Sequence, residues 1–309
     1  MIREFAVDPE LFCQWDHHVV LRHAFSREQG RLISAFPKKW KGLIREVLDR
    51  VEENKQLTAM QLLAITEWLR CEPGTQDVRM TKCAAAYDGT KAWHLNAEDS
   101  YAAFEGILSH REFDAPNAIR ADETHSYVTT SAFKAETQRT VQRRKRPIID
   151  CVRPVLKGAA QIKVIEPHFD PNKERFRNVL EALLDRLSQD GSSVRAVELH
   201  IGDPSDEDRN QDRPLRFTKA ELHRHLQPLL RSGWTLCVHL WRRGKEKLHP
   251  RYLLTDLAGV QIDHGWDEGE LESETTPIHL MSESRRSQEW RRYQEGTEDF
   301  TLGEIIVIE

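Results

Sequence analysis

The chain has 309 residues, of which 39% are hydrophobic and 31% are charged, and its formal net charge is −5. This length is sufficient for two domains of ordinary size, and the net charge gives no global attraction to nucleic acid, so phosphate binding would require a local basic patch. The apolar stretches are short and interrupted by charges, which excludes a transmembrane helix, and the N-terminus lacks the features of a signal peptide. We therefore expect a cytoplasmic protein without a membrane-spanning segment.

The cysteine pattern indicates neither a metal site nor a disulfide framework. The five cysteines stand singly, without CxxC spacing, and their number is odd. We expect them to be reduced packing residues, and we expect no cofactor and no bound metal. The five are Cys13, Cys71, Cys83, Cys151 and Cys237.

The first half of the chain mixes helical and strand-like patterns. Apolar residues recur at helical spacing in residues 37–54 and again in residues 57–70, which predicts two packed helices. Residues 78–98 read as two strands joined at Asp88 and Gly89, a dipeptide typical of hairpin turns. The pattern therefore favours strands that follow a helical pair.

A further helix and a connector are expected before the second half. Residues 100–111 have a helical pattern, and residues 1–134 are therefore expected to form an α+β domain. Residues 135–159 continue as a long helical pattern that Pro147 and Pro154 interrupt. We interpret this segment as a helical connector.

The second half alternates strands and helices in a regular way. A strand at 160–166, a helix at 172–191 and a strand at 194–201 predict a parallel pair joined by a right-handed crossover. The strands that follow predict an antiparallel finish, so residues 160–309 are expected to form an α/β domain with a mixed sheet flanked by helices. The later elements are a helix at 217–233, with Thr218 and Glu221 as a capping box, and strands at 234–242, 247–256, 259–265 and 304–309.

One of these strand segments, KLHPRYLLTD at 247–256, contains His249, Arg251 and Asp256 in an otherwise apolar run. Side chains alternate along a strand with a period of two, so His249 and Arg251 share one face and are able to point at one ligand. Asp256 lies on the other face by the same rule. We expect it to support the hairpin or to reach a neighbouring strand.

This spacing resembles the HxKxxxxD motif of the phospholipase D superfamily, with arginine in the position of the lysine. The order of the predicted strands and helices is similar to one half of that fold. Residues 154–184 also resemble the opening segment of bacterial phospholipase D-like domains and of the C-terminal domain of MIT-domain proteins. Together these similarities cover residues 150–309, whereas residues 1–149 suggest no family.

The resemblance implies phosphodiester chemistry without a metal. In such chemistry an imidazole attacks phosphorus to form a phosphohistidine, a cation holds the nonbridging oxygens, and a second histidine protonates the leaving oxygen. The resemblance assigns the role of nucleophile to His249 and that of phosphate clamp to Arg251. It adds Asp256 to the catalytic set in a supporting role.

The sequence departs from the family pattern in ways that also suit a binding module. Full activity in the superfamily needs two motifs, and this chain has one, so a complete site requires a homodimer or a borrowed histidine. The segment 265–270 places Asp267 and Glu268 where they would repel an anion unless they bind a cation or point away. Arginine for lysine also recurs in the MIT-associated relatives, which are regarded as binding modules.

The motif residues have structural interpretations as well. The histidine suits a strand residue with one hydrogen bond, and the arginine suits an ion pair with Asp263 or Glu198 across the sheet. His168 and Asp170 follow the first predicted strand of the second half, where ligand contacts gather in open α/β sheets. We nevertheless favour Asp170 as the cap of the next helix.

Two arginine-rich segments are candidate nucleic-acid contacts. Residues 143–146 form the densest basic run, and such a run is either a solvated helix face or a contact to phosphates. The second segment, residues 284–294, also carries Trp290 and Tyr293. These two aromatic side chains suit either stacking on bases or docking of the predicted helix. The candidate binding residues are Arg143, Arg144, Arg146, Arg285 and Arg286.

The sequence therefore predicts a phospholipase D-like phosphodiesterase, specifically a nuclease that acts through a phosphohistidine in a bacterial antiviral-defence or DNA-processing system. The association with defence rests on analogy between domain combinations. The alternative is a non-catalytic phospholipase D-like module that binds nucleic acid or a protein partner in a multi-subunit complex, and a scaffold is a third interpretation. We expect a homodimer or a larger complex.

Overall fold

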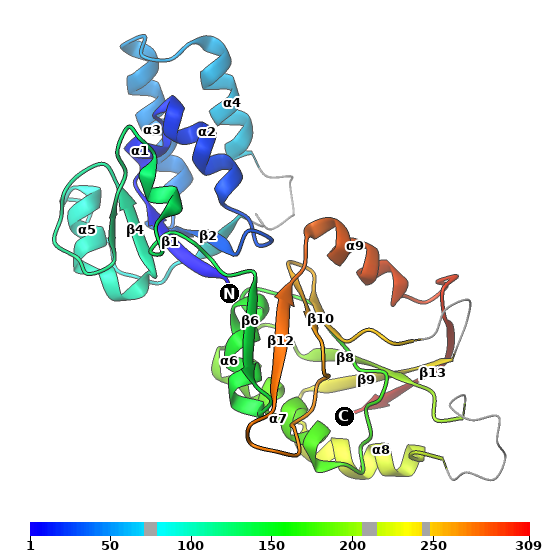
Figure 1. Ribbon diagram of the computed structural model, residues 1–309. Helices are drawn as coiled ribbons and strands as arrows, with labels where there is room; N and C mark the ends of the chain where they lie inside the picture. The colour runs from blue at the N-terminus through cyan, green and yellow to red at the C-terminus, as the bar shows by residue number, and fades with distance from the viewer. Residues whose placement is uncertain (71–78, 206–214, 243–247) are drawn as a thin grey trace. The chain divides into compact units, whose positions relative to one another are not determined.

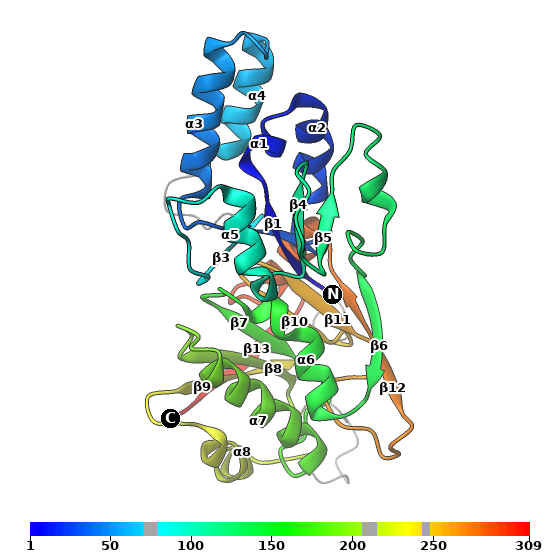
Figure 2. The same ribbon diagram turned by 90° about the vertical axis from the view of Figure 1, so that its left-hand side faces the viewer.

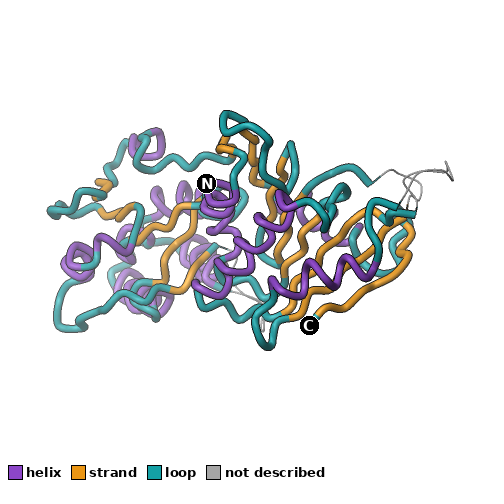
Figure 3. Tube along the Cα trace, turned by 90° about the horizontal axis from the view of Figure 1, so that it is seen from below, coloured by secondary structure: helices purple, strands orange, loops and turns teal. Residues whose placement is uncertain are grey.

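The computed structural model describes residues 1–70, 79–205, 215–242 and 248–309. It divides the chain into two compact units, Ile2–Glu136 and Thr137–Glu309. Each unit combines helices with a sheet, as Figure 3 shows. None of the helices in the described ranges is long and apolar enough to span a bilayer.

The N-terminal unit is built on a parallel sheet (Figure 1). Its five strands within the described residues follow the order β3-β2-β1-β4-β5, and every neighbouring pair is parallel. This arrangement is α/β, so the expectation of an α+β domain was wrong, because parallel neighbours require crossover connections instead of hairpins. The strands are β1 (Arg3–Val7), β2 (Arg31–Ala35), β3 (Met80–Lys82), β4 (Gly106–Ser109) and β5 (Ala118–Arg120). The helices are α1 (Pro9–Phe12), α2 (Trp15–Ala24), α3 (Trp40–Glu53), α4 (Ala59–Leu69) and α5 (Trp93–Asp99), with the 3-10 turns η1 (Tyr101–Ala103) and η2 (Ser126–Thr129).

The two predicted helices of this unit are confirmed as α3 and α4, but the predicted hairpin and third helix were wrong. Asp88 does not join two strands. Its side chain accepts the backbone N–H of Thr90 at 2.9 Å in a local turn, and the chain then forms helix α5 where the second strand was expected. Residues 100–111 contain the 3-10 turn η1 and strand β4 instead of an α-helix. A buried four-residue parallel strand carries no alternation that would distinguish it from a short helical segment.

Apolar residues of the parallel sheet alternate between two cores. Phe5, Ile33 and Leu108 pack into a cluster with α1, α3 and α4, whereas Ala6 and Ile107 pack with residues of α5 on the other face. Helices therefore cover both faces of the sheet.

The second unit contains the predicted mixed sheet. Within the described residues its eight strands follow the order β13-β9-β8-β7-β10-β11-β12-β6, with β7, β8 and β9 parallel and the other pairs antiparallel. This confirms an α/β architecture with a parallel start and an antiparallel finish. The strands are β6 (Gln138–Gln142), β7 (Ile162–Ile165), β8 (Ala196–Gly202), β9 (Thr235–Arg242), β10 (Tyr252–Thr255), β11 (Gly259–Ile262), β12 (Thr275–Leu280) and β13 (Thr301–Ile308). The helices are α6 (Lys145–Leu156), α7 (Glu174–Gln189), α8 (Lys219–Leu226) and α9 (Glu283–Arg292), with the 3-10 turn η3 (Gln227–Leu229).

Several boundaries differ from the sequence prediction. The strand expected at 247–256 is limited to β10, Tyr252–Thr255, so His249 and Arg251 precede it and do not share a strand face. The segment expected as a helical connector, 135–159, contains both β6, which pairs with β12, and the amphipathic helix α6. The helix expected to end at Gly233 ends at Leu226, because Pro228 continues the chain in a 3-10 turn. Its capping box of Thr218 and Glu221 is confirmed.

Helices lie on both faces of the second sheet. Helices α6 and α7 lie side by side along it (Figure 2), and apolar residues of α7 are buried. Helix α9 covers the other face, where Ile165, Trp241 and Tyr252 form a cluster with Tyr293. This arrangement leaves the ends of the strands to carry polar side chains.

Four cysteines, Cys13, Cys83, Cys151 and Cys237, are free thiols within the described ranges, and Cys71 lies outside them. Burial raises the pKa of Cys13 to about 12, which keeps this thiol protonated and unreactive.

Candidate functional site

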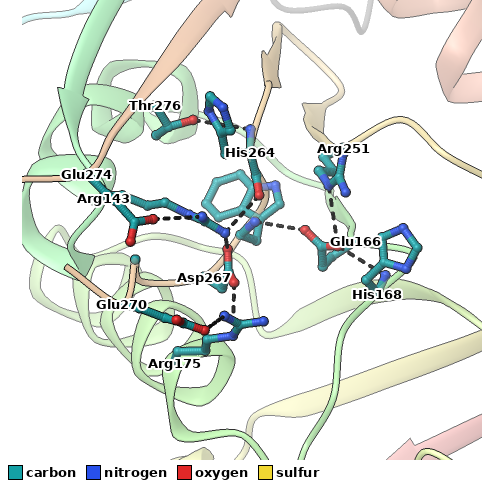
Figure 4. A network of polar contacts seen from close by, with 12 residues as sticks. Arg143, Glu166, His168, Arg175, Arg251, His264, Asp267, Glu270, Glu274 and Thr276 are labelled. Atoms are coloured by element: carbon teal, nitrogen blue, oxygen red, sulfur yellow. Dashed lines mark hydrogen bonds and ion pairs between the residues drawn. The ribbon is translucent and has the colours of Figure 1, made fainter.

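One edge of the second sheet collects polar residues from several strands. Tyr252 of β10 pairs with Ile165 of β7, and because the strands are antiparallel, Arg251 and Glu166 leave the sheet at the same edge. The chain that follows β11 and the chain that precedes β12 meet there as well, since Ile262 pairs with Ile278. Strand pairing therefore gathers residues that are far apart in the sequence (Figure 4).

Two histidines stand at this edge. His249, which precedes β10, is exposed, and its ring lies 6.4 Å from that of His168, centroid to centroid, at an interplanar angle of 89°. His168 follows β7 and is also exposed. Sequence reasoning considered His168 but did not join it to the motif. The available signal was its position just after the first strand of the domain, at a carboxyl end.

Asp170 forms a turn and does not cap the next helix. Its side chain accepts the backbone N–H of Asn172 at 3.0 Å, and the N-cap position of α7 is Lys173. The preference for Asp170 as a cap was therefore wrong by three positions. The turn places His168 on the surface side of the loop.

Arg251 lies beside a buried carboxylate. Its Nε atom is 3.7 Å from Oε1 of Glu166, and its guanidinium also donates to the carbonyl of Asp263 at 3.4 Å. Within the described residues, Arg251 makes no ion pair with Glu198, which was one of the two partners expected from the sequence. Only 19% of the Arg251 side chain is exposed, so it presents a limited set of donors to solvent.

Glu166 holds two loops of the site through hydrogen bonds to their backbone. It is almost fully buried, and it accepts the backbone N–H groups of His168 at 3.0 Å and of Trp266 at 2.8 Å. Burial raises the pKa of Glu166, and the two N–H bonds and the charge of Arg251 oppose that rise. Glu166 therefore fixes the loops that carry His168 and Trp266.

Asp267 and Glu268, expected to repel an anion, are both engaged with donors. Asp267 is buried and is held by the guanidinium of Arg143 and by Arg175, whose Nε lies 3.1 Å from its Oδ2. Burial raises the pKa of Asp267, and Arg143 is the main group that lowers it. Glu268 accepts from the side chain of Asn178 at 2.7 Å. Both carboxylates are therefore paired with donors of the same unit.

Glycine is required at position 265 for this arrangement. Its φ is +113°, and a Cβ there would lie 2.9 Å from Oε2 of Glu166 and 3.2 Å from Oδ1 of Asp267. No other residue combines this backbone conformation with so close an approach. Gly265 therefore allows two buried carboxylates to pack on one segment of backbone.

The structure separates Asp256 from the other motif residues. Asp256 follows β10 at the opposite edge, and its Oδ1 accepts the backbone N–H groups of Ala160 at 2.9 Å and Gln161 at 3.1 Å. It therefore joins the end of β10 to the beginning of β7. This matches the supporting role that strand parity predicts, and Asp256 does not contact His249.

The candidate binding arginines are largely engaged within the unit. Arg143 also donates to the carbonyl of His264 at 2.9 Å, and Arg144 donates to that of Gly269 at 2.6 Å. On α9, Arg285 donates to the hydroxyl of Tyr252, and Arg286 is only 11% exposed. Arg146 differs, since 89% of its side chain is exposed and its nearest carboxylate is Asp150, with Nε 3.7 Å from Oδ2.

A second polar cluster lies under α9. The ligand atoms of Glu198, His200 and His239 lie within 4.8 Å of one another, as in a metal site. The hydrogen bonds do not suit a cation, however. Trp241 donates to Nδ1 of His200 at 2.9 Å, which places the imidazole proton on Nε2, and Nε2 in turn donates to Glu198 at 3.0 Å.

Glu198 in this cluster already has a cationic partner. The ammonium of Lys163 lies 3.1 Å from Glu198 and donates to the carbonyl of Tyr293 at 2.6 Å. Burial lowers the pKa of His200 to about 4, which keeps the ring neutral. We therefore interpret the cluster as a hydrogen-bonded interior that joins α9 to the sheet.

A scan against protein-family models found no match for this sequence, and a search of curated proteins found no similar protein.

Proposed function

We propose that the second unit is a phospholipase D-like phosphodiesterase, acting as a nuclease through a phosphohistidine. The observation that carries the proposal is the pair of exposed imidazoles, His168 and His249, together with Arg251, which contacts the same Glu166 carboxylate that accepts the backbone N–H of His168. Reacting atoms stand about 3 to 3.5 Å apart before a displacement. The ring centroids of the two histidines lie 6.4 Å apart, so both imidazoles can reach the same phosphoryl group.

The roles follow from this placement. A neutral His249 attacks phosphorus and forms an N–P bond, the P–O bond to the leaving group breaks, and a protonated His168 gives its proton to the departing oxygen. Arg251 donates to the nonbridging oxygens. Water then attacks phosphorus, gives a proton to His168, and releases His249 as the N–P bond breaks. In this arrangement one chain supplies both histidines, so the second motif of the superfamily is not needed.

The test is cleavage of labelled single-stranded and double-stranded DNA and RNA. We expect His249→Ala to abolish cleavage and His168→Ala to slow it by about 10²- to 10⁴-fold, the usual contribution of a general acid. Arg251→Ala should reduce activity by roughly 10- to 100-fold, since a hydrogen bond to a charged group contributes about 1.5 to 3 kcal/mol. EDTA should have no effect.

A surface histidine on α8 provides the matched control. His223 is exposed and lies outside the site, so His223→Ala should cleave as fast as the wild type. Cleavage that persists in His249→Ala, or that requires a divalent metal, would exclude this mechanism. Melting temperatures of all variants separate loss of chemistry from loss of folding.

The second candidate is a binding module, and the position of Arg251 favours it. Because Arg251 lies near Glu166 and donates to a backbone carbonyl, part of its charge is already satisfied. In that case the wild type cleaves none of the four substrates. Arg251→Ala then weakens binding to nucleic acid, or to a protein partner, while His249→Ala changes the affinity only slightly.

A further inference from the structure

The N-terminal unit has a pocket at the point where its strand order reverses. β1 has β2 on one side and β4 on the other, so the crossovers leave β1 and β4 in opposite directions. In open α/β sheets, ligands bind beyond the carboxyl ends of strands at such a point. A pocket of about 610 Å³ extends from this point along α1, α2 and the α3–α4 hairpin, and Glu10 after β1 and His110 after β4 are part of its wall.

A buried hydrogen-bonded group supports this wall. Asp8, which is 3% exposed, accepts the hydroxyl of Ser109 at 2.7 Å and the backbone N–H of Glu10 at 2.9 Å. Its Oδ2 is also 3.5 Å from Nδ1 of His110, a buried atom without a hydrogen bond among the described residues. A carboxylate beside one imidazole nitrogen orients the ring.

The charges of the pocket do not suit a phosphate. The connection after β1 is Asp8-Pro9-Glu10, which has no glycine, and Pro9 lacks an N–H that could donate to an anion. The carboxylate of Glu10 forms ion pairs with two nearby cations. Its Oε2 lies 2.6 Å from Nη2 of Arg111, and its Oε1 lies 3.7 Å from Nη2 of Arg50. Although burial raises it, the pKa of Glu10 is held below its ordinary value by Arg111, so its charge persists.

The rest of the lining suits a planar heterocycle with hydroxyl groups. Trp15 contributes an aromatic ring that stacks on His18, and Val47, Val51 and Leu57 contribute apolar surface. Carboxamides can donate to and accept from the edge of a nitrogen heterocycle, and carboxylates accept from sugar hydroxyls. The amide side chains of the lining are Gln14, Asn54, Gln56 and Gln61, and its further carboxylate is Asp16.

We propose that this pocket binds a neutral nucleoside, with the base against Trp15 and the sugar hydroxyls toward Glu10 and His110. The volume is within the range of small-molecule sites. The site is independent of the histidine pair of the second unit. It gives the N-terminal unit a ligand-binding role that its sequence did not indicate.

The test uses isothermal titration calorimetry of the full chain with adenosine, guanosine, cytidine and uridine. Each nucleoside is compared with its 5′-monophosphate in the Arg251→Ala variant, which lacks the phosphate clamp proposed for the second unit. At least one nucleoside should bind saturably, and its monophosphate should bind roughly tenfold more weakly, because the carboxylates repel the phosphate. Trp15→Leu should weaken nucleoside binding by roughly tenfold or more, and Trp15→Phe, which keeps an aromatic ring, should restore most of it.

The variant Glu10→Gln removes the negative charge of this side chain and keeps its size, so it tests whether the charge discriminates against the monophosphate. It should bind the nucleoside within a few-fold of the wild-type affinity and should reduce the discrimination against the monophosphate. Tyr101→Ala, which alters an exposed aromatic outside the pocket, should bind like the wild type, and so should His249→Ala. The proposal is wrong if no nucleoside binds below about 1 mM, if a monophosphate binds more tightly than its nucleoside, or if folded Trp15→Leu keeps full affinity.

Discussion

His18 is a fully buried imidazole within an aromatic cluster of the N-terminal unit. Its ring lies 5.0 Å from that of Phe12 and 6.4 Å from that of Trp68, and neither ring nitrogen makes a hydrogen bond of good geometry to the described residues. Burial lowers its pKa to about 4, and the charge of Arg22 adds to that shift. An aromatic hydrocarbon would suit this position better than an imidazole.

We predict that His18→Phe stabilises the protein by about 1 to 3 kcal/mol, the usual cost of an unsatisfied buried polar group. The effect of His18 on the free energy of unfolding of the wild type also depends on pH. Between an ordinary pKa of 6.5 and the folded value of about 4 the unfolded state binds the extra proton, so stability is present above pH 6.5 and is lost as the pH falls toward 4. The variant should lose less stability over this window.

Urea unfolding at pH 7 and pH 5 measures both effects. His23→Phe is the matched control, because His23 lies on the same helix but is exposed. A His18→Phe protein that is less stable than the wild type, or whose pH dependence is unchanged, would contradict the prediction.

At the same scale, the sequence identified half of the histidine pair. His249 and Arg251 were singled out from their spacing in the strand expected at 247–256, although both precede β10, which begins at Tyr252. His168 was not joined to them, because their proximity depends on the pairing of β7 with β10, which periodicity does not reveal. The same limit applies to Asp8 and His110 in the N-terminal unit.

At the scale of elements, Asp256 connects two strands of the second sheet. It accepts two backbone N–H groups at the beginning of β7, from Ala160 and Gln161. Hydrogen bonds to a charged acceptor are stronger than neutral ones. Its position therefore supports the antiparallel pairing of β10 with β7, which in turn aligns His249 with His168.

We predict that Asp256→Ala lowers the free energy of unfolding by about 1 to 3 kcal/mol. The rate of phosphodiester cleavage, if present, should change less than twofold at a temperature where the variant is folded. Chemical denaturation and the cleavage assay check the two parts. Glu272→Ala, which removes an exposed carboxylate of the same unit, should be neutral in both. A folded Asp256→Ala protein without activity would return Asp256 to the catalytic set.

Elements differed in how far the sequence predicted them. Helices such as α3 and α7 were recognised because their apolar residues recur over several turns, and the β10–β11 hairpin was recognised from its two apolar runs. The parallel strands β1, β2, β4 and β5 of the first unit were missed, since they have only three to five residues, and β4 is buried throughout. β6 was read as helix because its sequence, QRTVQ, is mostly polar and exposed.

At the scale of the whole molecule, the boundary between the units falls before β6. Helix α6 buries six side chains against the second unit, and β6 supplies the outer partner of β12. Full burial of an apolar side chain contributes about 1.5 to 3 kcal/mol, so these six contribute roughly 10 kcal/mol. That is comparable with the entire stability of a domain, about 5 to 15 kcal/mol.

We predict that a fragment of residues 137–309 folds and unfolds cooperatively, whereas a fragment of residues 160–309 does not. The shorter fragment corresponds to the domain boundary expected from sequence, and it lacks both β6 and α6. Near-ultraviolet circular dichroism and urea unfolding distinguish the two. A cooperative transition in the shorter fragment, with the midpoint of the longer one, would show that α6 contributes little.

The pairing of β6 with β12 also determines the order of events on the ribosome. Synthesis proceeds at about 5 to 20 residues per second, so the roughly 130 residues between these strands take on the order of 7 to 27 s to appear. During that interval β6 has no strand partner, and an unpaired strand is a site for association with other nascent chains. The five residues of β6 are mostly polar and exposed, so during this interval the strand offers little apolar surface to other nascent chains.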